Sequence, residues 1–201
     1  MLETVTYIAQ LFIGQVLNEG DIAIDATAGN GKDTVFLAEH VGETGHVYAF
    51  DIQEIALDRT HRLLQEFHLN HRCTLIRACH SKLLDHIPAS LHKHIRAVMF
   101  NLGYLPGGDR SITTDVETTM AAVRSAFHLL NVGGRISIVV YPGHPAGTEE
   151  SEALIHWSRR FPRDIAIAVQ YRRLNSSDRS PYLILIEKRR DVPASGSEFL
   201  R

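Results

Sequence analysis

The chain has 201 residues, a net charge of −2 and hydrophobic residues at 44% of its positions. This length suits one α/β domain, which we place at residues 1–190, and is too short for two domains of ordinary size. The near-neutral charge excludes an overall basic field for nucleic acid, and no stretch approaches the ~20 apolar residues that a membrane span needs.

Helices and strands are predicted to alternate along most of the chain. Large apolar side chains recur three or four residues apart over residues 2–17, which predicts an amphipathic helix. Strands are expected at about 21–25, 46–51, 73–78, 95–100 and 135–141, and helices at about 31–40, 54–68 and 115–129. We expect the last of these helices to stop at the break Gly133-Gly134, and a further helix to begin near Thr148, with Thr148 as its cap.

The end of the chain has a different pattern. Two predicted strands, about 165–173 and 181–188, flank the polar run 175–180 and therefore form a hairpin. Alternating strands and helices predict a parallel sheet covered on both faces, and the hairpin makes one edge antiparallel. The predicted fold is a seven-stranded, mostly parallel Rossmann-like α/β sheet, in the element order of class I methyltransferases. Residues 191–201 are expected to be a flexible tail.

The run from Asp25 to Gly31 joins a short apolar strand to a helix. Gly29 and Gly31 give the backbone the freedom for a tight turn that a ligand can approach closely. The next strand ends at Asp51, and a carboxylate at the tip of the second strand is where a ribose diol is bound.

Two phosphate-binding motifs are excluded at this turn. The dinucleotide fingerprint would need glycine at Thr34, and a phosphate loop would need Ser or Thr at Asp33. Asp33 at a helix start would also repel a phosphate. A cationic adenosine cofactor with a diol and no phosphate, S-adenosylmethionine, fits better. The alternative is that Asp25 is only a helix cap and the glycines only a turn.

A polar, glycine-rich segment, 101–109, directly follows the buried fourth strand. Its start, Asn-Leu-Gly-Tyr, resembles the Asn/Asp-Pro-Pro-Tyr motif of methyltransferases that act on nitrogen. In that motif the Asn oxygen and the next carbonyl accept hydrogen bonds from an amine, which orients a neutral NH₂ for in-line attack. Asn101 and Tyr104 are therefore the candidate catalytic residues, with Leu102 and Gly103 beside the substrate. A plain surface turn is the alternative.

Three further side chains are expected to border the same crevice. Tyr141 would stack on a base and His144 would take a proton or contact the substrate, although a Pro/Gly turn leading into a helix explains them equally well. His80, just past the third strand, would lie at the adenine ring, and a plain loop histidine is the alternative.

The distribution of charged residues, cysteines and histidines bears on the partner, the cellular setting and metal binding. Between Arg159 and Arg190 nine Lys or Arg residues face three acids, which is compatible with an RNA partner or with solvated strand ends. Cys73 and Cys79 form no disulfide or metal framework, which indicates a reduced, cytoplasmic setting. The twelve histidines are scattered, so no metal is predicted.

Four segments, 25–34, 50–53, 100–106 and 143–144, together resemble a small bacterial family long labelled rRNA methylases. This family is associated with methylation of 5-aminomethyl-2-thiouridine at the tRNA wobble position. The resemblance spans about residues 4–190 and implies N-methylation of the aminomethyl group to give 5-methylaminomethyl-2-thiouridine. Ala78-Cys79-His80 departs from the family pattern, which has an acidic residue followed by Gly-His at the expected adenine position.

The implied partners and residues follow from this resemblance. The cofactor is S-adenosylmethionine, and the macromolecular partner is the anticodon stem-loop of tRNA, without a membrane; pairing into a homodimer is left open. The expected cofactor-binding residues are Asp25, Thr27, Ala28, Gly29, Asn30, Gly31, Asp33, Asp51, Gln53, His80 and Asn101, and the expected substrate-binding residues are Leu102, Gly103, Tyr104, Tyr141 and His144. The alternatives are an rRNA, small-molecule or protein N-methyltransferase, and a non-catalytic module that binds S-adenosylmethionine.

Overall fold

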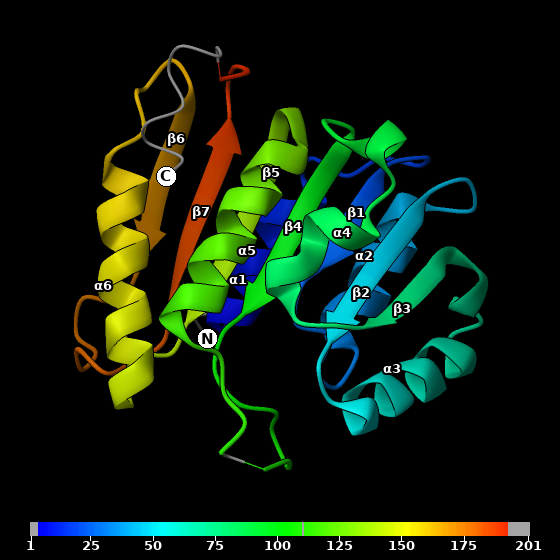
Figure 1. The fold of residues 1–201 in the computed structure, drawn as a ribbon, viewed down its shortest axis with the longest axis horizontal. Coiled ribbons are helices and arrows are strands. Elements are labelled where there is room, and N and C mark those ends of the chain that lie inside the picture. Colours follow the sequence, from blue (N-terminus) through cyan, green and yellow to red (C-terminus); the bar gives the residue numbers. More distant parts are fainter. Residues whose placement is uncertain (1–3, 110, 193–201) are drawn as a thin grey trace.

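The computed structural model of the chain describes residues 4–109 and 111–192 (Figure 1). The strands are β1 (Ile22–Asp25), β2 (His46–Asp51), β3 (Cys73–Arg77), β4 (Ile95–Asn101), β5 (Leu130–Val140), β6 (Ala166–Tyr171) and β7 (Tyr182–Lys188). The helices are α1 (Val5–Gly14), α2 (Lys32–Val41), α3 (Glu54–Glu66), α4 (Leu83–His86), α5 (Val116–Leu129) and α6 (Pro145–Arg159). The expected tail lies outside the described residues from 193 onwards, and Asp191 before it pairs with Lys188 at 2.9 Å.

The seven strands form one sheet in the order β3-β2-β1-β4-β5-β7-β6. The first five are parallel, and β7 pairs antiparallel with both β5 and β6. This confirms the predicted fold, including the closing hairpin. Strand order reverses between β1 and β4, and in open α/β sheets ligands bind in the crevice beyond the carboxyl ends of the strands at that point.

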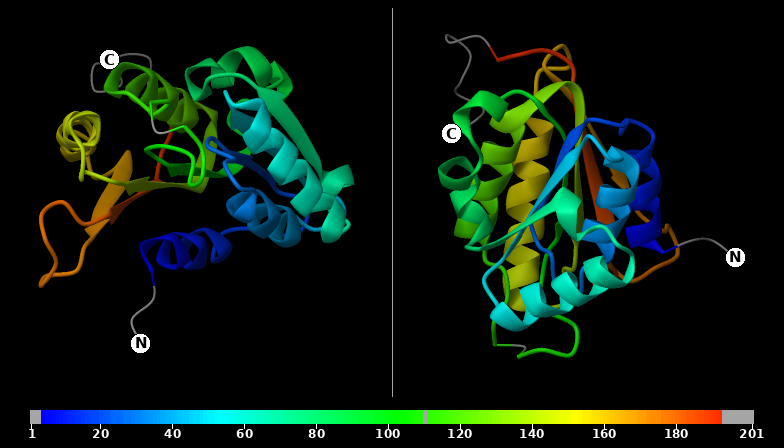
Figure 2. Two further views of the ribbon diagram at one scale, coloured as in Figure 1. Left: turned by 90° about the horizontal axis from the view of Figure 1, so that it is seen from below. Right: turned by 90° about the vertical axis from the view of Figure 1, so that its right-hand side faces the viewer.

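Helices cover both faces of the sheet (Figure 2). One apolar core joins α1, α2 and α3 to strand residues such as Ala23, Val47 and Met99. The other joins α4, α5 and α6 to the alternate residues, such as Ile24 and Phe100. Because successive side chains of a strand point to opposite faces, the apolar strands fill both cores at once.

The Gly133-Gly134 break is not where a helix stops, so this prediction was wrong. α5 ends at Leu129, and β5 begins at the next residue, with Leu130 paired to Ile95. Gly133 has φ of +81° and lies in a bulge of β5 that Arg96 crosses, since a Cβ there would be 3.1 Å from the Arg96 Nη1. A strand bulge needs the same freedom as a helix end, so the glycines alone could not distinguish the two.

The predicted start of the sixth helix was also wrong. α6 begins at Pro145, and the cap is His144, whose Nδ1 accepts a hydrogen bond from the Gly147 N–H at 3.1 Å. Thr148 lies inside the helix, where its hydroxyl donates to the Pro142 carbonyl at 3.1 Å. Proline is favoured at the first helical position because its fixed φ suits a helix and its missing N–H is not needed there.

The loops at the carboxyl ends of the parallel strands lie below the sheet in Figure 1. The longest of these loops follows β4. The loop between β6 and β7 lies at the same end, because Tyr182 at the start of β7 pairs with Val140 at the end of β5. Within the part of the chain that the structure describes, no helix is long and apolar enough to span a bilayer.

Candidate functional site

A cavity of about 890 Å³ opens at the switch point between β1 and β4. Fourteen of the sequence-predicted site residues line it, namely Thr27, Ala28, Gly29, Asn30, Asp33, Asp51, Gln53, His80, Asn101, Leu102, Gly103, Tyr104, Tyr141 and His144. Asp25 and Gly31 do not. The tertiary structure thus brings together in one cavity residues that are more than a hundred positions apart in the chain.

Hydrogen bonds to the side chain of Asp25 stabilise the turn after β1, residues 25–31. This side chain is fully buried. It accepts hydrogen bonds from the Thr27 N–H at 3.1 Å and from the Thr34 hydroxyl at 2.6 Å. Burial, followed by the nearby Asp33, raises the pKa of Asp25 to about 7. Asp25 therefore supports the turn and does not itself reach the cavity.

The two glycines of the turn have different surroundings. Gly31 has φ of +82°, and a Cβ there would come within 2.9 Å of the Thr60 Cα on α3, so the turn and the helix pack backbone to backbone. Gly29, with φ of +55°, has only ordinary contacts near its Cβ position and lines the cavity. Gly31 is needed for packing, whereas Gly29 leaves the backbone of the turn open to the cavity, and its role in ligand binding stays a prediction.

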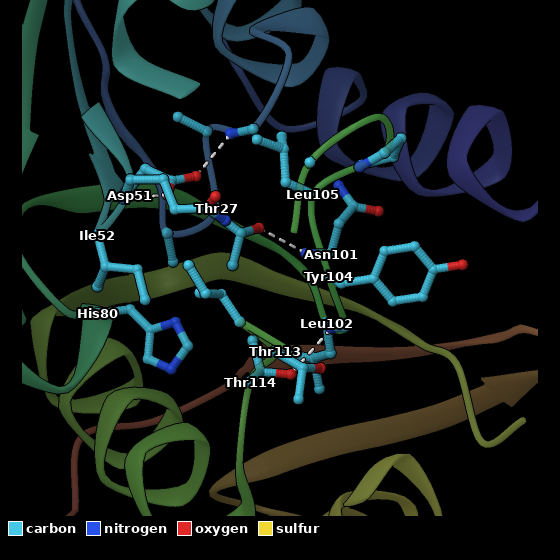
Figure 3. A pocket seen from close by; sticks show the side chains of 18 of the residues that line it. Thr27, Asp51, Ile52, His80, Asn101, Leu102, Tyr104, Leu105, Thr113 and Thr114 are labelled. Atoms are coloured by element: carbon cyan, nitrogen blue, oxygen red, sulfur yellow. Dashed lines mark hydrogen bonds between the residues drawn. The ribbon is translucent and has the colours of Figure 1, made fainter. Parts of the chain in front are cut away.

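Asp51 at the end of β2 faces the cavity beside this turn (Figure 3). Its carboxylate accepts the N–H of Gly29 at 3.0 Å and that of Gln53 at 2.9 Å. Burial raises the pKa of Asp51, and these backbone donors act in the opposite direction. Two oxygens with about four lone-pair sites still leave acceptors for a ligand hydroxyl pair.

The loop after β4, residues 102–115, runs out and back as a short hairpin. Tyr104 pairs with Thr113, and the Gly103 N–H donates to the Thr114 hydroxyl oxygen at 2.9 Å. That hydroxyl donates in turn to the buried carboxylate of Glu150 on α6 at 3.0 Å. The loop is therefore fixed by its own return strand and by a distant helix, which the sequence did not predict.

Asn101 occupies the junction between the turn after β1 and this loop. Its backbone N–H donates to the Thr27 hydroxyl oxygen at 2.7 Å, and its side-chain Nδ2 donates to Asp33. The side-chain oxygen is buried and has no hydrogen-bond partner among the residues that the structure describes. In Figure 3 Asn101 lies between Thr27 and Tyr104. An unpartnered buried acceptor is costly, so it points to a ligand that donates a hydrogen bond.

His80 lines the opposite side of the cavity, next to Ile52 in Figure 3. Burial lowers its pKa to about 4, against a backbone hydrogen bond with Ala26 that favours the charged form. The ring is therefore neutral at physiological pH, and its buried Nε2 has no partner in the described part of the chain. A neutral ring nitrogen at this position suits the polar edge of a heterocyclic base.

His144 and Tyr141 lie on the rim near α6. Because Nδ1 of His144 accepts the capping hydrogen bond, the proton of the neutral ring is on Nε2, which is buried without a partner. In this tautomer Nε2 of His144 is a hydrogen-bond donor, and the predicted roles of His144 at the substrate stay predictions. Burial raises the pKa of Tyr141, and the neighbouring Asp33 contributes.

Comparisons with known proteins show to which family the chain belongs. Residues 47–187 match the family described as "Putative rRNA methylase". The chain belongs to this rRNA methylase family. It is 40% identical over 192 residues to the chloroplastic tRNA (mnm(5)s(2)U34)-methyltransferase of Arabidopsis thaliana, covering 92% of this chain and 69% of the relative.

Two solved structures of the same kind superpose closely on this rRNA methylase family member. An rRNA methylase of Clostridium thermocellum is 39% identical with a TM-score of 0.88, over 94% of this chain and 99% of that one. A methyltransferase of Streptococcus mutans, solved in complex with SAH, is 34% identical with a TM-score of 0.82 over the same shares. The protein is an S-adenosylmethionine-dependent methyltransferase, as the sequence predicted.

The cavity of this methyltransferase fits that cofactor. Its volume lies in the range of small-molecule sites, and it combines the acceptor Asp51, the neutral His80 and the open backbone at Gly29. Bound S-adenosylmethionine supplies an electrophilic methyl group. The individual contacts of the predicted residues stay predictions. Among the described residues, no three His, Cys, Asp or Glu side chains gather as they would around a metal.

Several residues of the site escaped sequence analysis. Thr6 and Gln10 on α1 line the cavity, and so do Leu105, Thr113 and Thr118. Arg59 on α3 was also missed: it donates to the Asn30 side-chain oxygen at 3.0 Å and to the Pro106 carbonyl at 3.3 Å. A polar Gln10 between buried Ala9 and Ile13 was the one local signal, whereas Arg59 reaches the site from an amphipathic helix like many other arginines.

Proposed function

We propose that this methyltransferase acts on the exocyclic amine of 5-aminomethyl-2-thiouridine at the tRNA wobble position and produces 5-methylaminomethyl-2-thiouridine. The observation that carries the proposal is the buried, unpartnered oxygen of Asn101 in the wall of the cavity. The similarity to the Arabidopsis relative, a tRNA (mnm(5)s(2)U34)-methyltransferase, supports this substrate.

An amine substrate matches the polar atoms of the loop after β4. Nitrogen must keep its lone pair free for attack along the S–CH₃ axis, so the protein has to hold its N–H groups through acceptors. The Asn101 oxygen is such an acceptor, and acceptors also stabilise the positive charge that grows on nitrogen. Tyr104, with 43% of its surface exposed at the mouth of the cavity, would present its ring to a base.

A nucleic-acid substrate is supported by the loop 172–181 between β6 and β7. It carries Arg172, Arg173 and Arg179 against one acid, Asp178, and it lies at the cavity end of the sheet. The Arg179 carbonyl would be 3.5 Å from a Cβ on Gly143, so this loop borders the rim segment 141–144. Phosphate groups are attracted to such a site by charge without regard to sequence.

The basic run 188–190 was a second candidate for this surface, and its position counts against it. β7 runs antiparallel to β5, with Tyr182 paired to Val140 at the cavity end and Glu187 paired to Arg135, so the run after Glu187 lies toward the end of the sheet opposite the cavity. Lys188 is buried and donates to the Leu130 carbonyl at 2.7 Å. Of these two basic segments, the loop 172–181 is therefore the one placed to contact an RNA whose base enters the cavity.

The test is methyl transfer to tRNA that carries 5-aminomethyl-2-thiouridine, with labelled S-adenosylmethionine and nucleoside mass spectrometry. We expect one methyl on that nucleoside and none on matched tRNA that lacks the aminomethyl group. Label on an adenine, on a ribose, or on rRNA in preference to tRNA would refute the assignment.

The remaining alternatives have their own discriminators. A small-molecule or protein N-methyltransferase would not need the arginines of the loop 172–181. A non-catalytic module would keep every biological activity after Asn101→Ala, whereas the enzyme would lose it. Contact with the anticodon stem-loop, homodimer formation and a cytoplasmic location stay predictions.

A further inference from the structure

We propose that Asp33 is a positioning residue that sets the polarity of the Asn101 side-chain amide, so that its oxygen and not its NH₂ meets the reacting amine. The inference rests on the proposed function, because it names how that site orients its substrate. It differs from the cofactor contact that the sequence predicted for Asp33.

The contacts of Asp33 carry the proposal. It is the second residue of α2, only 8% exposed, and lines the cavity. One of its oxygens accepts from the Gln10 side-chain Nε2 at 2.7 Å, and the other accepts from the Asn101 Nδ2. Two amides that arrive from α1 and β4 are thus bound by one carboxylate.

An ionised carboxylate has only acceptors, so each amide must turn its NH₂ toward it. This leaves the oxygen of Asn101 on the other side, where it is buried without a partner. If the amide were reversed, its NH₂ would donate to the lone pair of the substrate nitrogen. That is the pair which must attack the methyl group, so the reversed amide would oppose the reaction.

The groups around Asp33 determine the pKa of its carboxyl and therefore the pH at which it is ionised. Burial raises its pKa, whereas the amides of Gln10 and Asn101 and the charge of Lys32 act to lower it. Asp25 and Tyr141 are the other titratable groups that interact with it. When pH falls through this raised pKa, the protonated carboxyl becomes a donor on one oxygen and no longer enforces the orientation of Asn101.

The first test needs no variant of Asp33. The side-chain NH₂ resonances of Asn101, assigned by their loss in Asn101→Ala, are followed against pH in the ligand-free full chain. We expect them to shift with an apparent pKa above the ordinary aspartate value, and the shift to persist in Asp25→Asn. Resonances that do not titrate, or that titrate only through Asp25, would overturn the proposal.

The second test compares Asp33→Ala and Asp33→Asn with the exposed, matched control Asp58→Asn on α3. At saturating cofactor, Asp33→Ala should lower the methyl-transfer rate by about 10- to 100-fold, and Asp33→Asn by less, because asparagine keeps one acceptor oxygen. The dissociation constant for S-adenosylhomocysteine, measured by calorimetry, should change by less than about threefold, as expected for a transition-state effect.

A loss of cofactor affinity of about tenfold or more would instead assign Asp33 to the cofactor and overturn the proposal. An unchanged rate in Asp33→Ala would overturn it as well. If the wild-type protein fails to methylate 5-aminomethyl-2-thiouridine, the proposed function fails, while the resonance titration still decides the orientation of Asn101. The two failures are therefore distinguishable.

Discussion

The turn after β1 and the loop after β4 face the same cavity, yet they are built differently. In the turn, polar groups pair within the turn, with the start of α2, or with the adjacent strand: Asp25 accepts from Thr27 and Thr34, and Asp51 at the end of β2 accepts from Gly29. In the loop, support comes from far away, from Glu150 on α6, and the Asn101 oxygen remains unpartnered.

We call the turn after β1, together with Asp51, the cradle, and the loop after β4, together with Asn101, the presenting surface. The difference in hydrogen bonding indicates that the cradle is preformed, whereas the presenting surface has an acceptor ready for a ligand. The cradle satisfies its own polar groups, so it keeps its shape without a ligand. Asn101, at the start of the loop, leaves an acceptor unmet, and a donor group on a ligand would satisfy it. Arg59 joins the two parts, because it donates both to Asn30 in the turn and to Pro106 in the loop.

Replacing Asn101 by Ala should break the presenting surface alone. We expect the rate of methyl transfer to fall on the order of 10²-fold or more, the magnitude seen when one preorganised polar contact is removed. Calorimetry with S-adenosylhomocysteine should give a dissociation constant within about threefold of wild type, because binding of the cofactor is not the affected step. A parallel loss of rate and affinity would mean that the two parts are not separable.

Alanine at Gly31 and at Gly103 compares the packing of the two parts. Both glycines have positive φ, +82° and +121°, so each variant carries strain of about 1–3 kcal/mol. Gly31→Ala also collides with the Thr60 backbone, while nothing lies within 4 Å of a Cβ on Gly103. Urea unfolding should therefore give Gly31→Ala a free energy of unfolding lower than that of Gly103→Ala by about 1 kcal/mol or more. Equal stabilities would contradict the close packing of the turn.

Asp25→Asn tests the buried polar support of the cradle through pH. The folded-state pKa of Asp25 is about 7, above its ordinary value of 3.8, so the folded protein holds this proton more tightly than the unfolded chain. Stability from this group is full below pH 4 and declines as pH rises toward 7, by roughly 1.4 kcal/mol per pH unit at most.

The variant has no carboxyl to ionise and keeps an acceptor for Thr27. Its free energy of unfolding relative to wild type should thus increase from pH 4.5 to pH 7.5, as measured by urea titration at each pH. A constant difference over this range would show that Asp25 titrates normally.

Arg179→Ala should have the smallest effect, because it lies outside both parts. We expect a few-fold weaker affinity for tRNA and a dependence of log affinity on log salt that is shallower by about 0.9, as for one lost phosphate contact. Arg190→Ala is the matched control, since it lies at the opposite end of the sheet and pairs with Asp164 at 3.6 Å. Equal losses in the two variants would remove the loop 172–181 from the proposed RNA surface.

The sequence by itself determined the parallel sheet, the closing hairpin and the cavity residues that directly follow a strand. Such residues are local: a buried strand that ends in glycine or in a polar side chain, as at Gly29, Asp51 and Asn101, defines its own place at the sheet edge. The same local rules misplaced the start of α6. Threonine is a commoner cap residue than histidine, so Thr148 was predicted as the cap, but the helix begins at Pro145 with His144 as its cap.

Only the tertiary structure decided what supports these residues. The contacts of Asp33 with Gln10 and Asn101, and those of Arg59 with both parts of the site, join elements that are far apart in the chain. Hydrogen bonds of this kind depend on how helices pack over a sheet, which side-chain spacing within one element does not encode. The orientation of the Asn101 amide is therefore a property of the folded protein, although the sequence already indicated that Asn101 would be at the site.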